Sequence, residues 1–276
     1  MNKADFYYRK NLEDILEFGT IDENPRPKYK DGTPAHSYYI TQIFEKYDIS
    51  IGQFPITTLR NTAIKTGIKE ILWIFQDQNS SLVSARNRGV NWWEDWNIGD
   101  DTIGVRYGAT IRKWDLMNNL LKNLKKDPFS RRHIINMLQE DDLKESEGLY
   151  PCAYETLWSV RKINGVMYLD LTLNQRSQDY IMAGYINKIQ YVALQLMVCS
   201  HLGYKPGNFC HFVQNLHLYD RHIDAAKEIL DKEPLHIQPY IKLKNHKNFY
   251  DFDINDFEVG EIKGITKLKS KIELAI

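Results

Sequence analysis

Apolar residues recur every three or four positions in several stretches of the chain, which is the spacing of one face of an α-helix. Residues 3–18 show this pattern first, with Leu12, Ile15 and Leu16 near helical spacing. The same periodicity predicts further helices over residues 62–77, 115–125, 186–202 and 220–230. The stretch over 186–202 is strongly apolar, so we expect this helix to lie in the centre of the fold.

Other stretches alternate apolar and polar residues, which is typical of half-buried β-strands. Residues 166–173 alternate most regularly, and similar runs predict strands over 37–46, 134–138, 157–160 and 209–213 and a terminal strand pair. Helices and strands are mixed along the whole chain, which predicts an α/β or α+β fold. No internal repeat or Pro/Gly/Ser-rich linker divides residues 1–276, so we expect a single domain.

Composition narrows the classes of function. The chain has 276 residues, of which 43% are hydrophobic and 26% charged, as in an ordinary globular protein with a sizeable core. Lysine and arginine together number 36, and so do aspartate and glutamate. No global basic field is therefore present to favour non-specific binding of nucleic acid, and any site for an anion must be local.

Targeting signals and cysteines suggest the compartment. The first residues lack the apolar core of a signal peptide, and no run approaches the roughly 18 apolar residues that cross a membrane. The three cysteines are widely spaced, with no CxxC pair. This usage fits a reducing cytoplasm, where each thiol is either a core residue or a reagent. Cys199 and Cys210 have apolar neighbours in the sequence, which favours the core for both.

Cys152 follows a proline in a short turn that leads into a predicted strand. Taken alone, a cysteine is most simply a small buried hydrophobe. A nucleophilic cysteine needs nearby positive charge, which lowers its pKa from about 8.5. Arg131, Arg132 and Arg176 are the candidates to supply that charge.

Three basic sites in the sequence suit a phosphate. Arg131 and Arg132 follow Ser130 at the start of a predicted strand, and Arg176 precedes Ser177 at the end of another. Residues 22–34 form a polar loop that carries Arg26 and can close on an anion. Each site alone is usually a solvated strand end or loop. Together they favour a dianionic phosphate ligand, because planar guanidinium groups bind phosphate bidentately.

Other polar residues are ambiguous one at a time. Asn187 near the start of the apolar helix is either an N-cap or an amide that reads the N3–H and O4 edge of a pyrimidine. His217 and Tyr219 lie two apart in an extended segment, so both side chains face one side and could bind a ribose hydroxyl. Glu70 lies on or beside the buried stripe of its predicted helix.

These segments together closely resemble the thymidylate synthase family over nearly the whole chain. The matching segments are 68–73, 93–96, 103–108, 130–132, 151–152, 175–179, Asn187, 217–219 and 275–276. The interval from Asp179 to Asn187 and the order of Cys152 and Arg176 agree with the family. The insertion ahead of residues 32–36 is similar to the less common bacterial and phage branch.

The resemblance implies reductive methylation of dUMP by 5,10-methylenetetrahydrofolate, which gives dTMP and dihydrofolate. It implies that the Cys152 thiolate adds to carbon 6 of uracil and so activates carbon 5. Asn187 would hold the oxygen that gains charge, and Glu70 would act through water in proton transfer. Tyr107 would lie where the proton of carbon 5 is removed.

The resemblance also implies binding roles. The residues that would bind dUMP are Arg26, Gln175, Arg176, Ser177, Asp179, Asn187, His217 and Tyr219, with Arg131 and Arg132 donated by the partner subunit of a homodimer. Trp93 and Asp179 would contact the folate, and Ile276 would close over it as a lid. The folate supplies carbon and hydride, so the resemblance implies neither metal nor nicotinamide. The implied fold is a three-layer α/β arrangement whose large mixed sheet packs back to back in the dimer.

Two other functions remain open at the level of the sequence. A deoxyuridylate or deoxycytidylate hydroxymethylase of the same superfamily would quench the exocyclic methylene with water in place of hydride. Asn187 favours uracil, because the cytidylate enzymes tend to carry aspartate there. A binding-only protein for nucleotides or RNA is the third possibility, and the joint presence of Cys152, Glu70 and Trp93 argues against it, since binding alone needs no thiol.

Overall fold

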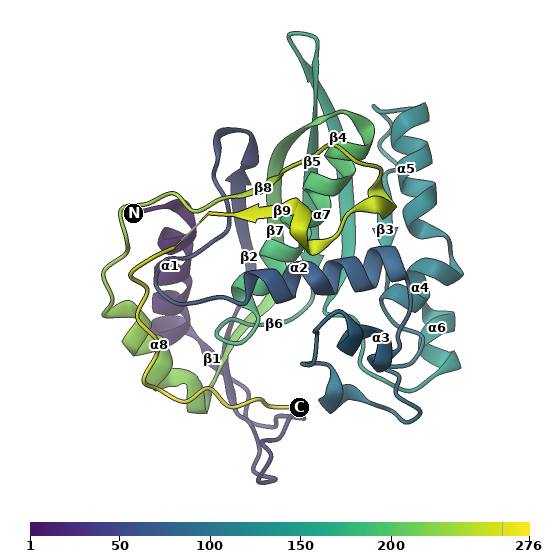
Figure 1. Ribbon diagram of the computed structural model, residues 1–276. Coiled ribbons are helices and arrows are strands. Elements are labelled where there is room, and N and C mark those ends of the chain that lie inside the picture. Colours follow the sequence, from purple (N-terminus) through teal and green to yellow (C-terminus); the bar gives the residue numbers. More distant parts are fainter. Residues whose placement is uncertain (261) are drawn as a thin grey trace.

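The computed structural model describes residues 1–260 and 262–276. The described residues form a seven-stranded mixed sheet in the order β1-β2-β7-β5-β4-β3, with β6 paired to β7 (Figure 1). Its strands are β1 (Thr20–Ile21), β2 (Ser37–Asp48), β3 (Ile134–Asn136), β4 (Ala153–Ile163), β5 (Val166–Gln175), β6 (Gln178–Asp179) and β7 (Lys205–Tyr219). A second, two-stranded antiparallel sheet joins β8 (Ile241–Leu243) to β9 (Phe257–Val259).

Strand pairing explains the centre of the sheet. The antiparallel β4–β5 hairpin turns at Asn164 and Gly165, which both have positive φ, as a tight two-residue hairpin turn requires. β5 and β7 are parallel neighbours, and a parallel pair needs a crossover connection. The helix α7 (Gly184–Leu202) lies within this crossover. β7 also pairs antiparallel with β2 along nearly its whole length.

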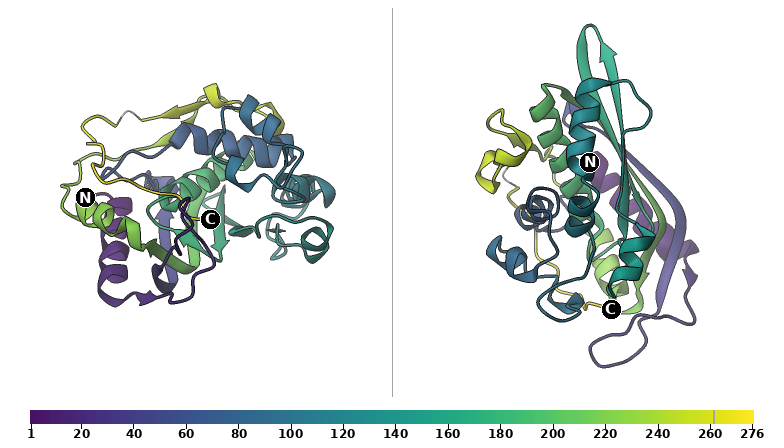
Figure 2. Two further views of the ribbon diagram at one scale, coloured as in Figure 1. Left: turned by 90° about the horizontal axis from the view of Figure 1, so that it is seen from below. Right: turned by 90° about the vertical axis from the view of Figure 1, so that its right-hand side faces the viewer.

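The helices lie in layers against the sheet. They are α1 (Lys3–Phe18), α2 (Ile64–Leu72), α3 (Leu82–Asn87), α4 (Gly108–Lys113), α5 (Leu116–Lys126), α6 (Glu140–Glu145), α7 and α8 (Ile223–Leu230). A π-helical turn (Trp73–Asp77) extends α2. α7 packs between the sheet and α2, and the β8–β9 pair lies farther out (Figure 2). The fold is therefore a mixed α/β domain in three layers, as predicted.

The two faces of the sheet are covered differently. In β5, Leu169, Leu171 and Leu173 are fully buried beneath the helices, and the residues between them are half-exposed. β7 alternates in the same way, with Phe209 buried and Phe212 half-exposed. Strands that alternate so regularly have one face packed on the core and one face uncovered within this chain.

The sequence-based elements are largely confirmed, with differences in extent. The predicted helix over 3–18 and the strands beginning at residues 37, 134 and 166 match closely, and the terminal strand pair is present. β4 and β7 are much longer than predicted, because pairing with neighbouring strands extends them through polar residues. The short elements α3, α4, α6, β1 and β6 were not predicted, since they are too brief to show a period. Among the described residues, no helix is long and apolar enough to cross a membrane.

Candidate active site

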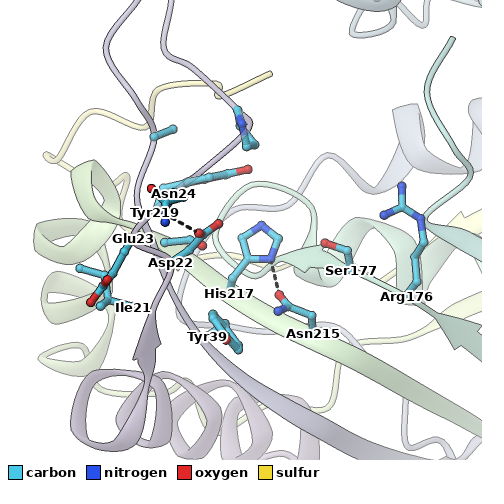
Figure 3. A pocket seen from close by; sticks show the side chains of 13 residues that line it. Ile21, Asp22, Glu23, Asn24, Tyr39, Arg176, Ser177, Asn215, His217 and Tyr219 are labelled. Carbon is cyan, nitrogen blue, oxygen red and sulfur yellow. Dashed lines mark hydrogen bonds between the residues drawn. The ribbon is translucent and has the colours of Figure 1, made fainter.

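A cavity of about 700 Å³ opens beside the end of β7. Its walls come from three parts of the chain that are distant in sequence: the loop after β1 with the start of β2, the segment after β5 and the last residues of β7. Figure 3 shows Arg176 and Ser177 on one side, the loop residues Asp22 and Asn24 on the other, and His217 between them. Polar side chains dominate this lining, which suits an anionic, hydrogen-bonding ligand.

Cys152 lies in the turn before β4, as predicted, and Arg176 holds this turn in place. The backbone N–H of Arg176 donates to Cys152 O over 2.9 Å. The Arg176 guanidinium donates to two further carbonyls of the turn, to Pro151 O over 3.0 Å and to Tyr150 O over 2.6 Å. Since Arg176 also lines the cavity, the thiol-bearing turn is fixed at the cavity by the same side chain that is predicted to bind phosphate.

Burial and two arginines act in opposite directions on the thiol. Burial raises the pKa of Cys152 above its ordinary value, and the positive charges of Arg176 and Arg26 lower it, with burial the stronger. Arg131 and Arg132 were candidates for this charge, but both are exposed and neither acts on the thiol within the chain. Within a single subunit the expectation does not hold, because the antiparallel register of β3 and β4 places the residues before Ile134 beyond Leu157, away from the Cys152 end of β4.

The other two cysteines differ from Cys152. Cys199 is buried in α7, and burial raises its pKa far above the ordinary value. Cys210 is half-exposed on β7, and burial is again the largest influence on its pKa, which is raised. The core interpretation therefore holds for Cys199, whereas Cys210 lies on the uncovered face of the sheet. All three cysteines, each in the described part of the chain, are free thiols.

Tyr107 also contacts the Cys152 turn. The backbone N–H of Cys152 donates to the Tyr107 hydroxyl over 3.0 Å. Burial raises the pKa of Tyr107 well above 10, so its side chain is a neutral phenol near neutral pH. The ring of Trp93 packs edge-on against Tyr107 at a centroid distance of 5.4 Å. Tyr107 and Trp93 therefore form one aromatic wall next to the thiol turn.

Glu70 is almost fully buried on α2, as its place on the apolar stripe predicted. Burial raises its pKa to about 7, and hydrogen bonding from Trp92, Gln190 and Trp93 opposes the rise. The Trp92 indole N–H donates to the carboxylate. At Gly67 a Cβ would lie only 3.2 Å from Ile186, so glycine lets α2 approach α7 and brings Glu70 toward Gln190.

Asn187 lies inside α7, which begins at Gly184, so the N-cap interpretation is wrong. Its side chain belongs to a network of amides. Asn187 Oδ1 accepts from Gln175 Nε2 and from Gln178 Nε2, each over 3.3 Å. Asn187 Nδ2 donates to Gln190 Oε1 over 3.1 Å. The amide is thereby held with distinct donor and acceptor ends, as reading a flat base edge requires.

Asp179 stabilises the turn between β6 and α7. Its Oδ1 accepts from the backbone N–H groups of Ile181 and Met182 over 3.0 and 2.9 Å. Its Oδ2 lies 3.7 Å from His222 Nδ1. The pKa of Asp179 is lowered, because hydrogen bonding and the charges of His222 and His217 outweigh the opposing effect of burial.

His217 and Tyr219 share one face of β7, as their spacing predicted, and both line the cavity. Their rings meet edge-on at 5.1 Å, and His217 Nδ1 lies 3.1 Å from Asn215 Oδ1 (Figure 3). Asn215 in turn donates its backbone N–H to Arg176 O over 3.2 Å. The end of β7 is therefore tied to the phosphate side of the cavity.

The C-terminal residues pair with the loop that carries Arg26. The backbone of Lys28 exchanges two hydrogen bonds with that of Ile276, over 2.8 and 3.0 Å. Tyr29 and Ala275 form a bridge beside this pair. The C-terminal end lies next to this loop (Figure 1), so the predicted lid and the predicted anion loop form one unit at the cavity.

Several residues of the site were not singled out from the sequence. Gln178 and Gln190 complete the amide network, and His211 Nε2 lies 2.9 Å from Gln175 Oε1. Of these three residues, only Gln178 lies in a segment that was matched to the family, residues 175–179. A glutamine by itself indicates no particular chemistry. Among the described residues, no group of three or more His, Cys, Asp or Glu side chains is arranged to hold a metal ion.

Comparison with known proteins gives one consistent result. The thymidylate synthase family profile matches residues 6–274. Thymidylate synthases of Streptococcus pneumoniae strain 70585 and Streptococcus mutans are 47% and 46% identical to this chain, each over the full length of both proteins. The solved structure of the thermostable thymidylate synthase A from Bacillus subtilis superposes with a TM-score of 0.89 at 33% identity, covering 99% of both chains. The chain therefore belongs to the thymidylate synthase family.

Proposed function

We propose that this chain catalyses the reductive methylation of dUMP by 5,10-methylenetetrahydrofolate, giving dTMP and dihydrofolate. The observation that carries the proposal is the contact between Arg176 and the Cys152 turn at the edge of the cavity. A nucleotide whose phosphate binds Arg176 and Ser177 has its base directed along the wall that holds the thiol. Remote phosphate binding then positions the reacting carbon.

The Cys152 thiolate adds to carbon 6 of the uracil ring, and carbon 5 gains the electron density that it needs to attack the methylene carbon of the folate. Loss of the carbon 5 proton and of the folate leaves an exocyclic methylene. Hydride from the folate reduces this methylene, and expulsion of the thiolate releases dTMP. Arg176 and Arg26 favour the thiolate against the effect of burial.

Asn187, Glu70 and Tyr107 act on the base. The Asn187 amide, held by Gln175 and Gln178, pairs with the N3–H and O4 edge of uracil. Glu70 has its pKa raised to about 7 by burial, which suits a group that exchanges protons through water near neutral pH. Tyr107 stays neutral and orients water at carbon 5. His217 and Tyr219 bind the ribose.

The folate binds against the aromatic wall that includes Trp93, with Asp179 contacting its ring and Ile276 closing over it. Trp93 is buried beside Tyr107, so a ring stacked there lies next to the thiol turn. The reaction needs a reduced thiol, and three free cysteines suit the reducing cytoplasm.

The enzyme works as a homodimer whose sheets pack back to back. The uncovered face of β5 and β7 supports this assembly, because half-exposed side chains such as Phe212 alternate there with buried ones. Exposed Phe44 on β2 adds apolar area to the same sheet. Arg131 and Arg132, exposed in this chain, then reach the phosphate in the partner's cavity.

The decisive experiment incubates the protein with dUMP and methylenetetrahydrofolate and follows dihydrofolate absorbance and nucleotide products together. We expect equal amounts of dTMP and dihydrofolate. Hydroxymethyl-dUMP without dihydrofolate would assign the chain to the hydroxymethylase reaction, which the names of the relatives do not favour. No conversion of dUMP, with tight nucleotide binding, would support a binding-only protein.

The covalent route is tested with Cys152→Ala, which should abolish turnover and leave dUMP binding measurable by calorimetry. Cys199→Ala is the matched control, because it removes a free thiol that is buried in α7 away from the cavity lining, and it should keep full activity. Normal turnover by Cys152→Ala would rule the covalent route out. Asn187→Asp should shift nucleotide preference toward dCMP, since an ionised carboxylate accepts from the cytosine amino group and cannot donate to O4.

A further inference from the structure

A buried chain of polar side chains runs from β7 to Asn187. His211 Nε2 lies 2.9 Å from Gln175 Oε1, and Gln175 Nε2 lies 3.3 Å from Asn187 Oδ1. Asn187 Nδ2 continues the chain to Gln190 Oε1 over 3.1 Å. Each amide and the imidazole can turn over to exchange donor and acceptor, so some fixed group has to set the direction of the whole chain.

Ser177 supplies this fixed point. Its backbone carbonyl accepts from Gln175 Nε2 over 3.0 Å, and a carbonyl oxygen can only accept. Turning the Gln175 amide over would place two oxygens 3.0 Å apart, which is repulsive. Gln175 must therefore present Nε2 to Ser177 and Asn187, and Oε1 to His211.

The surroundings of His211 favour the same direction. Because Gln175 presents an oxygen, His211 must donate from Nε2, which makes it the Nε2–H tautomer. His211 is fully buried, and its Nδ1 has no hydrogen-bond partner among the described residues. In the Nε2–H tautomer the orphan Nδ1 is only a lone pair, whereas the other tautomer would bury an unpaired N–H. Burial, aided by the charge of Lys188, lowers the pKa of His211 well below 6.5 and keeps the ring neutral.

Gln178 favours the same orientation of the Asn187 amide. Its Nε2 lies 3.4 Å from the carbonyl oxygen of Gly184, 3.3 Å from Gln175 Oε1 and 3.3 Å from Asn187 Oδ1. All three neighbours are acceptors, so Nε2 again points toward Asn187. Two amides, each anchored on a backbone carbonyl, therefore present N–H groups to one oxygen of Asn187.

We propose that His211 is a positioning residue that, with the Ser177 carbonyl, fixes the orientation of the Asn187 amide and thereby the preference for uracil over cytosine. The identity of the base rests on the proposed function, whereas the orientation rests on the contacts alone. With Oδ1 as acceptor and Nδ2 as donor, Asn187 matches N3–H and O4 of uracil. Turned over, the same amide would match N3 and the amino group of cytosine.

The hydrogen bonds of Asn187 leave its amide able to pair with the base. Nδ2 carries two N–H groups and gives one of them to Gln190. The two contacts to Oδ1, at 3.3 Å, are longer than the usual 2.9–3.0 Å, so a base N–H can replace one of them. Gln175 and Gln178 then act as guides that the substrate partly displaces.

The orientation is tested first without any ligand. Nitrogen-15 NMR of histidine-labelled protein distinguishes the two neutral tautomers, and His211→Gln identifies the signal by its loss. We expect the neutral Nε2–H form from pH 5.5 to pH 8. A neutral Nδ1–H form, or a ring that becomes protonated in this range, would overturn the relay whether or not the chain is a synthase.

The effect on base choice is tested by the ratio of dUMP and dCMP dissociation constants. His211→Phe keeps an aromatic ring beside Phe209 and removes the donor, and it should reduce the preference for dUMP about fivefold, the worth of one hydrogen bond. His211→Gln retains an N–H donor and should restore most of the preference. Thermal unfolding and circular dichroism verify that both variants are folded.

Two outcomes would overturn the role of His211. If His211→Phe weakens both nucleotides equally, the residue is only structural. If the preference is unchanged in His211→Phe but altered in Asn187→Asp, the orientation is set elsewhere. Methylation of dUMP by the wild type is measured in parallel, so that failure of the proposed function is seen separately.

Discussion

The backbone N–H of Cys152 donates a hydrogen bond to the Tyr107 hydroxyl over 3.0 Å, so a residue at the start of α4 holds the turn that carries the thiol. Tyr107 has a φ of 48°, which is unusual for a bulky residue. The next residue, Gly108, lets the start of α4 pack closely against Asn79, because a Cβ there would lie 2.5 Å from Asn79 O. Two segments distant in sequence, one with Arg176 and one with Tyr107, thus hold the turn that carries the nucleophile.

Tyr107→Phe should lower both stability and turnover. The ring still packs against Trp93, but the Cys152 N–H loses its partner, at a cost of about 1–3 kcal/mol if it stays buried. We expect kcat to fall at least about tenfold, since the thiol turn loosens and the water at carbon 5 loses the hydroxyl that orients it. Steady-state kinetics and thermal unfolding measure both effects. Tyr240→Phe removes a hydroxyl that bonds Glu258 far from the cavity, and it should change neither; a matching loss there would contradict a local cause.

Protonation of Glu70 should cause the fall in rate on the acidic side of the pH–rate profile. Burial raises its pKa to about 7, so the carboxylate needed for proton transfer forms only as the pH rises through that value. The rate of the wild type should therefore increase from pH 6 to pH 8. Glu70→Gln should reduce kcat by about 10²-fold or more and lose this limb. An acidic limb that survives in the variant would assign it to another group.

The same group has a predictable effect on stability. The pKa of Glu70 is higher in the folded protein than in the unfolded chain, so the folded state binds more protons between pH 4.5 and about 7. The contribution of Glu70 to stability therefore falls as the pH rises through this window. The free energy of unfolding of Glu70→Gln, relative to that of the wild type, should therefore increase by up to about 3 kcal/mol from pH 5 to pH 8, as measured by urea unfolding. A difference that is constant with pH would contradict the raised pKa.

Lys188 and Glu45 form a fully buried ion pair, with Nζ and Oε1 2.8 Å apart. The Tyr185 ring lies 4.2 Å from Nζ, and Tyr47 donates to the other carboxylate oxygen over 2.5 Å. Removing one charge leaves the other buried without its partner. Lys188→Met and Glu45→Gln should each cost about 3–5 kcal/mol.

The double variant of Lys188 and Glu45 completes the test. It should cost clearly less than the sum of the single variants, because neither charge remains. Urea unfolding at one fixed protein concentration gives the three values, which avoids effects of assembly. Strict additivity would show that the two residues do not stabilise each other.

Deletion of Ile276 should affect the folate more than the nucleotide. It removes both backbone hydrogen bonds to Lys28, and so frees the C-terminal segment from the loop of Arg26. We expect KM for methylenetetrahydrofolate to rise about tenfold and kcat to fall, as for loss of a closing lid, with a smaller change in dUMP affinity. Ile276→Leu keeps the backbone pair and is the control. Equal losses of affinity for the folate and for dUMP would show that the C-terminal residue also acts at the nucleotide site.

The elements with strong periods, the mixed α/β class and most residues of the candidate site could be predicted from the amino-acid sequence. Cys152, Arg176 and Asn187 were candidates from residue type and spacing, and their joint assignment, with the role of Glu70, came from the resemblance to the family. Weak or short elements such as α4 and β6 could not, since their conformation depends on neighbours that are distant in sequence.

The protonation and orientation of those residues depend on contacts that only the folded chain makes. The raised pKa of Glu70 follows from the packing of α2 against α7, which removes water from the carboxylate. The direction of the Asn187 amide follows from Ser177 O and from His211 on β7. Electrostatic and hydrogen-bond energies depend on distance in space, and folding alone brings a strand, a turn and a helix within hydrogen-bonding distance of one another.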